Sequence, residues 1–309
     1  MGGRPVMKLP LLFPMLLGAA LAARADTTIQ KKDGTAQVAK ALRRDKDNII
    51  ATIDIQPAKA GDPVQQGDVG IPIAQIAKIE FGEPAALKTA PDLLIQAKSP
   101  EAMAQIDQAL KYYAGFRDAP GSWWADLLLM KMNALVSAGR EKEADALAES
   151  MNGQSTDPES KRAAKVLLAS ATLRKGDAKS AAESLDSVLK DGTKQDVLAA
   201  AAIYKGQSLL ALKDWENALL SFLQVPVLYP EQKALAPASM LGVGRAHFGL
   251  EDFEAAKKAL RELMKTFKGT PEAIAGKAEM EAIAKRERAL SDPTARKDPA
   301  AADNPPAPK

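Results

Sequence analysis

The sequence contains no cysteine and a single histidine among its 309 residues. Without cysteine the protein has no disulfide bond, no thiol nucleophile, no cysteine-based metal site and no cysteine that could carry a lipid anchor. A lone histidine has no second histidine or cysteine with which to share a metal ion, and it lacks the other members of a catalytic triad. Stability must therefore come from the hydrophobic core, and the chain is long enough to build one.

The chain also has little net charge. Its 42 basic and 39 acidic residues give a formal charge of +3. Arg4, Lys8 and Arg24, all close to the N-terminus, account for that whole excess, so the rest of the chain is neutral. Because nucleic-acid binders need a positive surface, we expect no nucleic-acid partner.

Residues 1–25 have the pattern of a secretory signal peptide. A basic start is followed by an apolar run from Leu9 to Ala23, and Ala23-Arg24-Ala25 forms a small-x-small cleavage site before Asp26. The apolar run is short for a bilayer span. We predict cleavage between Ala25 and Asp26 and a periplasmic or secreted protein with no integral membrane span, an uncleaved anchor being the alternative.

Residues 26–82 favour a small all-β domain. An Asp33-Gly34 pair marks a hairpin turn, and Asn48–Ile55 alternates apolar and polar residues as a half-buried strand does. The expected strands are Thr27–Lys31, Thr35–Leu42, Asn48–Ile55, Val69–Ile73 and Ile76–Phe81, separated by a charged turn at Arg43–Asp47 and a loop at Gln56–Asp68. Five short strands predict an SH3-like or Sm-like β-barrel.

The end of this segment, Ile71 to Phe81, resembles the paired final strands of Sm-like barrels. The resemblance covers this module alone. It implies RNA binding in cytoplasmic members, which the signal peptide and the neutral charge of this chain both oppose.

The remainder of the chain is predicted to be helical. Residues 83–98, with Pro84 and Pro91, are expected to form a linker, and residues 99–290 a continuous series of helices. The tail, residues 291–309, carries five prolines and no large apolar residue, so we expect it to be disordered.

A short turn followed by an alanine recurs along the helical part. The alanines Ala144, Ala181, Ala218 and Ala256 follow one another at intervals of 37, 37 and 38 residues. A fixed period of this size marks a stack of structural repeats, in which no unit buries its apolar face alone. The sequence thus predicts a mainly α fold, an α-solenoid preceded by the small β-barrel.

Placing each alanine at position 20 of a 34-residue unit brings other residues into register. Gly206 and Gly244 then fall at the small position 8, Trp215 and Phe253 at the aromatic position 17, Phe222 and Leu260 at position 24, and Pro230 at position 32. This pattern resembles the tetratricopeptide repeat (TPR), a pair of antiparallel helices. The match is good for residues 199–271 and degenerate for 125–193, and the extra residues per unit predict longer turns. The segment 99–118 resembles the second helix of an incomplete leading unit.

No group of residues forms a convincing catalytic, cofactor-binding or metal-binding constellation. His247 falls at a helix-packing position, and the glycines of Gly242-Val243-Gly244 lie in a helix rather than after a strand. Tyr112-Tyr113 and Trp123-Trp124 are interpreted as packing of the first helices against the barrel or each other, with a recognition patch as the alternative. We predict that the protein is not an enzyme and has no cofactor.

The TPR resemblance implies a concave groove lined by the first helix of each unit. At position 9 of that helix the register places Asn133, Ser170, Gln207 and Arg245, all polar among largely apolar neighbours. Polar side chains in a groove can bond a peptide backbone. These four residues are the predicted partner-binding site, although an ordinary solvated face would give the same pattern.

Together these observations predict an exported, non-catalytic adaptor that binds a protein or peptide. The resemblance extends to envelope TPR proteins, which implies a role in cell-envelope assembly or coordination, but the chain lacks both an N-terminal coiled coil and a lipid-anchor cysteine. The alternative is an accessory subunit or hydrolase with its site in the N-terminal β module.

Overall fold

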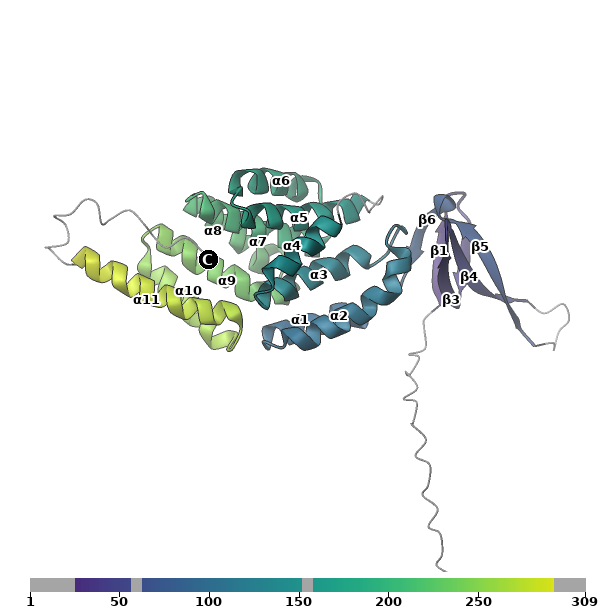
Figure 1. The fold of residues 1–309 in the computed structure, drawn as a ribbon, viewed down its shortest axis with the longest axis horizontal. Helices are drawn as coiled ribbons and strands as arrows, with labels where there is room; N and C mark the ends of the chain where they lie inside the picture. The colour runs from purple at the N-terminus through teal and green to yellow at the C-terminus, as the bar shows by residue number, and fades with distance from the viewer. Residues whose placement is uncertain (1–25, 57–62, 152–157, 292–309) are drawn as a thin grey trace, which may run out of the picture.

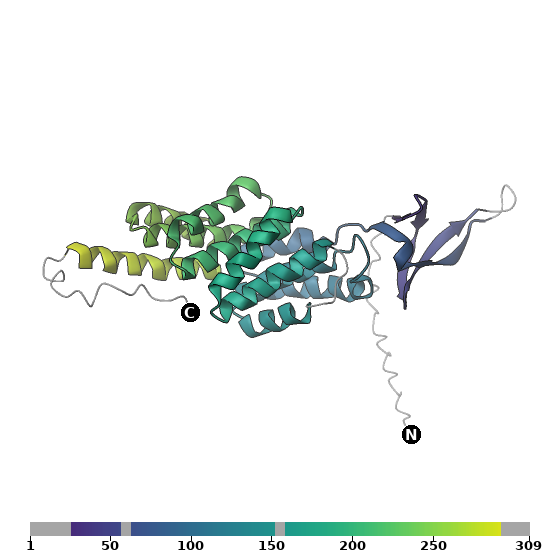
Figure 2. The same cartoon turned by 90° about the horizontal axis from the view of Figure 1, so that it is seen from above.

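The computed structural model describes residues 26–56, 63–151 and 158–291, so the predicted signal peptide and nearly all of the predicted tail lie outside the described residues. The described chain is mainly helical. A small β module stands at one end of a stack of helices, and the last helix, α11, reaches toward the opposite end (Figures 1 and 2).

The β module consists of two three-stranded antiparallel sheets. The strands are β1 (Thr27–Lys31), β2 (Ala36–Ala39), β3 (Ala41–Asp45), β4 (Asn48–Ile55), β5 (Gln65–Pro72) and β6 (Ile76–Glu80), with a short 3-10 helix, η1 (Ile73–Gln75), before β6. The strand orders are β2-β1-β6 and β3-β4-β5. The apolar side chains of both sheets share one core, in which Ile29, Ile49, Ile76 and Ile79 are almost fully buried.

The predicted closed barrel is not seen among the described residues. In each sheet one edge strand, β5 or β6, pairs with a single neighbour, and the two are not paired to each other. The predicted strand Thr35–Leu42 is divided at Lys40, whose backbone N–H donates to the Thr52 carbonyl at 2.7 Å. The division sends β2 and β3 into different sheets. The hairpin turn is as predicted, with Gly34 at a φ of 86°.

The helices form five consecutive hairpins and a final single helix. They are α1 (Ala85–Ile95), α2 (Ser99–Tyr113), α3 (Trp124–Ser137), α4 (Glu141–Ser150), α5 (Pro158–Arg174), α6 (Ala178–Asp191), α7 (Gln195–Ala211), α8 (Trp215–Leu228), α9 (Ala236–Gly249), α10 (Phe253–Thr266) and α11 (Pro271–Ser291). Short 3-10 helices, η2 (Ala114–Phe116) and η3 (Lys233–Leu235), follow α2 and precede α9.

The linker predicted over residues 83–98 is mostly helix α1, so the leading repeat is complete. Proline is tolerated here because Pro84 lies just before the helix and Pro91 loses only one helical hydrogen bond. Part of the extra length per repeat also lies in helices rather than in turns, since α5 and α7 both run for 17 residues.

The same turn joins the two helices of every hairpin. One residue adopts a left-handed conformation, and the residue five positions later is a buried alanine. The left-handed residues are Ala97, Gly139, Gly176, Lys213 and Glu251, and the alanines are Ala102, Ala144, Ala181, Ala218 and Ala256. In each turn the left-handed residue donates its N–H to a carbonyl three residues earlier, which satisfies an orphan group of the helix end.

Packing between the helices follows the predicted register. A Cβ atom added to Gly206 on α7 would lie 2.8 Å from the ring of Phe222 on α8, and one added to Gly244 on α9 would lie 2.6 Å from Leu260 on α10. Gly242 on α9 meets the same Phe222 ring from the other side. The small position 8 and the large position 24 are therefore confirmed as a close helix contact.

The β module is joined to the helices by backbone bonds and aromatic packing. Ile79 of the β6 edge donates its N–H to the Pro120 carbonyl at 2.9 Å, and Gly121 leaves no room for a side chain against Ile79. The ring of Phe81 packs edge-on against Tyr113 and Phe116. The prediction that the aromatic pairs pack against the β module is confirmed for Tyr113.

Candidate functional site

The four predicted groove residues lie on successive first helices, but the structure does not leave them in an open channel. Ser170 on α5 has no exposed surface, and its hydroxyl donates to the Leu167 carbonyl of its own helix at 2.8 Å. It cannot touch a partner in this conformation. Asn133 on α3 lies 3.4 Å from the hydroxyl of buried Tyr204, which belongs to α7.

The other two are partly exposed. Arg245 on α9 forms an ion pair with Glu279 on α11 at 2.7 Å, and Gln207 on α7 is half-buried. The ion pair uses Nε of Arg245, so a partner's carboxylate would compete with Glu279 for the guanidinium. Binding through Asn133, Gln207 or Arg245 stays a prediction.

The inner side of the stack is closed by the chain itself. A Cβ atom added to Gly269, in the turn before α11, would lie 3.9 Å from Ala97 in the first hairpin. Glu272, at the start of α11, accepts hydrogen bonds from Ser137 on α3 and from Thr270, while its burial raises its carboxyl pKa. The first and last repeats therefore meet.

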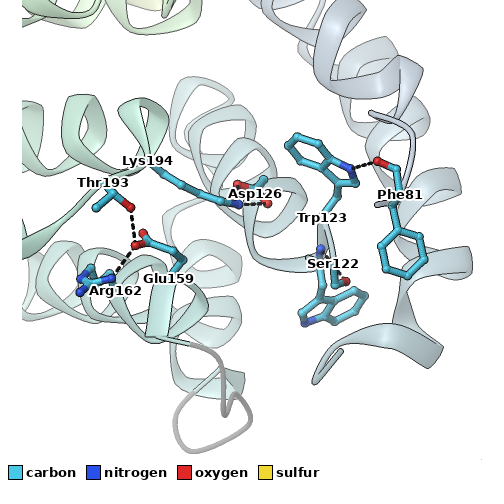
Figure 3. A network of polar contacts seen from close by, with 9 residues as sticks. Phe81, Ser122, Trp123, Asp126, Glu159, Arg162, Thr193 and Lys194 are labelled. Atoms are coloured by element: carbon cyan, nitrogen blue, oxygen red, sulfur yellow. Dashed lines mark hydrogen bonds and ion pairs between the residues drawn. The ribbon is translucent and has the colours of Figure 1, made fainter. Parts of the chain in front are cut away.

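A partly buried polar network ties the first turns of three helices to the β module (Figure 3). Lys194, just before α7, holds both carboxylate oxygens of Asp126 on α3, at 2.6 and 2.8 Å. The Lys194 ammonium also lies 5.3 Å from the centre of the Trp123 ring. The Trp123 indole N–H donates to the Phe81 carbonyl at 3.2 Å, which confirms for this residue the predicted packing against the β module.

Next to this lysine, Thr193 donates to Glu159 on α5 at 2.6 Å, and Arg162 pairs with the same carboxylate at 2.5 Å (Figure 3). Acidic residues at helix N-termini are favourable because the helix dipole is positive there. The network is suited to holding helices in place. Asp126 is only 4% exposed, so a substrate has little access to it.

Asp196, in the first turn of α7, is the most perturbed acid of this region. Burial raises the pKa of its carboxyl to about 6, from 3.8, and the nearby Asp126 carboxylate contributes to the rise, while Lys194 opposes the shift. A carboxyl with a raised pKa is a frequent feature of active sites, but structural networks produce the same shift. The second carboxylate beside it, Asp126, is held through both oxygens by Lys194.

The most unusual surface feature is an apolar stripe on the outer face of α8. Leu220, Leu223 and Val227, spaced as i, i+3 and i+7 on one side of the helix, are 62%, 37% and 71% exposed. They lie opposite Phe222, which fills the contact with α7 and α9. Pro226 and Leu228 are exposed beside them. We call Leu220, Leu223 and Val227 the α8 stripe.

Neighbouring repeats carry charged residues at the same positions. Counting from the buried alanine of each repeat, the equivalents of the α8 stripe are Glu183, Asp186 and Lys190 on α6, and Lys258, Arg261 and Lys265 on α10. All six are exposed. The outer face of a repeat is thus normally polar, and α8 departs from that rule. Sequence reasoning missed the stripe, and aligning the repeats position by position was the signal that could have found it.

Two further features are smaller. A shallow hollow of about 550 Å³ between α2, α3 and α4 is lined by Trp124, Leu128 and Leu147 among others. His247 lies at the end of α9 with its Nδ1 3.5 Å from the Asp252 carboxylate, which caps α10. Within the described ranges, no cluster of three or more His, Asp or Glu side chains could hold a metal ion.

None of the described helices combines the length and the apolar character needed to cross a lipid bilayer. No protein-family model matches the sequence, and no curated protein matches it. Two solved structures are similar in part: the TPR-like repeats of a putative kinesin light chain from Podosopora anserina, and a glutamine-to-methionine variant of the same protein. Each is 16% identical and covers 59% of this chain and 93% or 92% of its own, with TM-scores of 0.33 and 0.34. Similarity at this level does not establish a family.

Proposed function

We propose that this protein is an exported, non-catalytic scaffold that binds another protein through the α8 stripe. The single observation that carries the proposal is the exposure of Leu220, Leu223 and Val227 at positions where the adjacent repeats carry charged residues. An exposed apolar patch on a soluble protein is a frequent mark of an interaction site. The predicted signal peptide supports a location outside the cytoplasm.

The stripe is better placed for binding than the predicted inner groove. The inner residues are occupied, Ser170 by its own helix and Arg245 by Glu279. The α8 stripe is apolar, exposed and carried by a rigid helix whose opposite side is locked between α7 and α9. A rigid helix with anchors at i, i+3 and i+7 loses little conformational freedom on binding another helix.

Site-specific photo-cross-linking in cells that produce the protein tests this function. A photoreactive benzophenone amino acid replaces Val227 in one variant and Leu220 in a second, and proteins attached after irradiation are identified by mass spectrometry. Matched controls carry the same amino acid at Lys190 and Glu183, the equivalent positions on α6. A further variant carries it at Gln207, to test the predicted groove.

We expect the same protein to be attached from both α8 positions and from neither α6 position. Attachment from Gln207 alone would place binding in the inner groove and would contradict our choice of surface. If no α8 or groove position yields a product, the scaffold function itself is wrong.

A further inference from the structure

Helix α10 carries Glu254, whose pKa is lowered by its hydrogen bond to Lys257 and in part by the charge of Arg261, and Glu262. Three basic side chains of the same helix lie one repeat beyond the α8 stripe. They are Lys258, Arg261 and Lys265, the α10 equivalents of the stripe residues. All three are exposed, and none forms an ion pair within the part of the chain that the structure describes. The adjacent Lys257, by contrast, pairs with both Glu254 and Glu287 at 2.7 Å. We call these three cations the α10 basic column.

The stripe and the column face the same side of the molecule. On α8, Phe222 points inward between Gly206 of α7 and Gly242 of α9. On α10, Leu260 points inward at Gly244 of α9 and lies 3.7 Å from a Cβ added to Gly276 of α11. Since both inner faces pack in the same way, both outer faces point away from the inner helices in the same direction.

The flank formed by α6 has a different charge. It presents Glu183, Asp186 and Lys190, and Asp186 is already held by Lys205 at 2.5 Å. A partner that lies across α8 therefore meets cations available for pairing on the α10 side, and a mixed, partly neutralised surface on the α6 side. The α10 edge of the apolar stripe carries more basic than acidic exposed side chains, and the α6 edge does not.

We propose that the occupant of this surface is an amphipathic helix of another protein, with an apolar stripe that packs on α8 and an acidic edge that faces the α10 basic column. This proposal rests on the proposed scaffold function and adds the chemistry of the partner. Carboxylates of the partner helix gain from Lys258, Arg261 and Lys265, because charge complementarity selects the partner and fixes its orientation.

Charge also distinguishes this partner from two other occupants. An anionic bilayer presents uniform negative charge, and it would meet Glu183 on the α6 flank as well as the basic column. A second copy of this chain would have to pair the column with its own α6 flank. In that flank Asp186 already forms an ion pair with Lys205, and Lys190 has the same charge as the column and would repel it.

Two synthetic helical peptides test the inference. Both carry leucines spaced to match the stripe; one has glutamates along one edge, and the other has lysines at the same positions. Their affinities for the mature chain are measured by fluorescence anisotropy at low and high salt. We expect the acidic peptide to bind on the order of tenfold more tightly at low salt, and the difference to shrink at high salt.

Variants assign the preference to the residues named. Reversing the charge of the column with K258E, R261E and K265E together should make the basic peptide bind more tightly than the acidic one. R261E alone should reduce the difference between the two affinities. The matched control E183K, on α6, should leave the order unchanged. L220S with V227S should weaken both peptides. All the changed residues are exposed, so each variant should fold, and circular dichroism checks that it does.

Several results would overturn the inference. These are equal affinity for the two peptides, an order unaffected by reversal of the column, or tight binding of phosphatidylglycerol vesicles that needs the same residues. Self-association in sedimentation velocity that L220S with V227S abolishes would assign the surface to a second copy. Equal peptide affinities alongside cross-links from α8 would refute the acidic partner while leaving the scaffold function intact. Absence of cross-links from both α8 and Gln207 would remove the scaffold function instead.

Discussion

Replacing Asp196 by asparagine should stabilise the protein above about pH 6. The carboxyl of Asp196 is half-buried at the start of α7, close to the Asp126 carboxylate, and its pKa is raised to about 6 from 3.8. A raised pKa means that the folded state disfavours the ionised form. Folding therefore carries a cost that is absent below about pH 4, grows between about pH 4 and 6, and is complete above that range.

The size of the effect follows from the shift. A difference of about two pKa units corresponds to about 3 kcal/mol, which is an upper limit because the unfolded chain and the asparagine amide also interact with their surroundings. We expect Asp196→Asn to raise the free energy of unfolding by about 1–3 kcal/mol near pH 8 and to change it little near pH 4.

Urea unfolding followed by far-UV circular dichroism, at a series of pH values, measures this difference. Asp126→Asn is the matched control, because it removes the same charge from the same network but takes away the carboxylate that holds Lys194. That variant should be destabilised by about 1–3 kcal/mol. A loss of stability in Asp196→Asn near pH 8, or a gain that does not depend on pH, would refute the reasoning.

Three further predictions follow from the packing and the sequence. Ala218, near the start of α8, is fully buried, so Ala218→Leu should overpack this site; chemical denaturation should show a loss of about 1–3 kcal/mol, and no loss would mean that the register is wrong. Gly242→Ala pushes a methyl group into the Phe222 ring and should cost a similar amount, much of it recovered when Phe222→Leu is added to make room. The N-terminal residue of protein purified from its natural cells should be Asp26, as mass spectrometry can determine; an intact Met1 would contradict the signal peptide.

The repeats could be predicted from the sequence because their signals are local. A left-handed turn residue, a small residue and an alanine at fixed spacing act within one hairpin, and each hairpin contacts mainly its neighbours. The pairing of small Gly206 with bulky Phe222 could be predicted for the same reason. The predicted signal peptide also rests on a local pattern, but it lies outside the described residues and stays a prediction.

The second helix of the first hairpin was predicted over residues 99–118, but its first helix, α1, was predicted as a linker. Pro84 and Pro91 are typical of a linker, and Ala102 lies 42 residues before Ala144, outside the period of the other repeats. Helix α1 is stable because Ala90 and Leu94 are buried in the common core, and that burial outweighs an unfavourable local sequence. The open edge of the β module was missed for a similar reason, since whether β5 and β6 meet depends on how sharply the chain bends at Lys40.

The pattern of residues along the chain was enough to specify a stack of helical hairpins behind a small β module, with balanced charge and no cysteine chemistry. Which surfaces are open depends instead on packing in three dimensions. Whether the predicted groove remains a channel depends on curvature that accumulates over five repeats, until Ala97 approaches Gly269, and on the contacts that Asn133 and Arg245 make with other helices. Whether Leu220 and Val227 are core or surface is equally undecided by their identity. The same apolar residue can face a neighbouring helix or solvent, and only the positions of the neighbouring helices decide which.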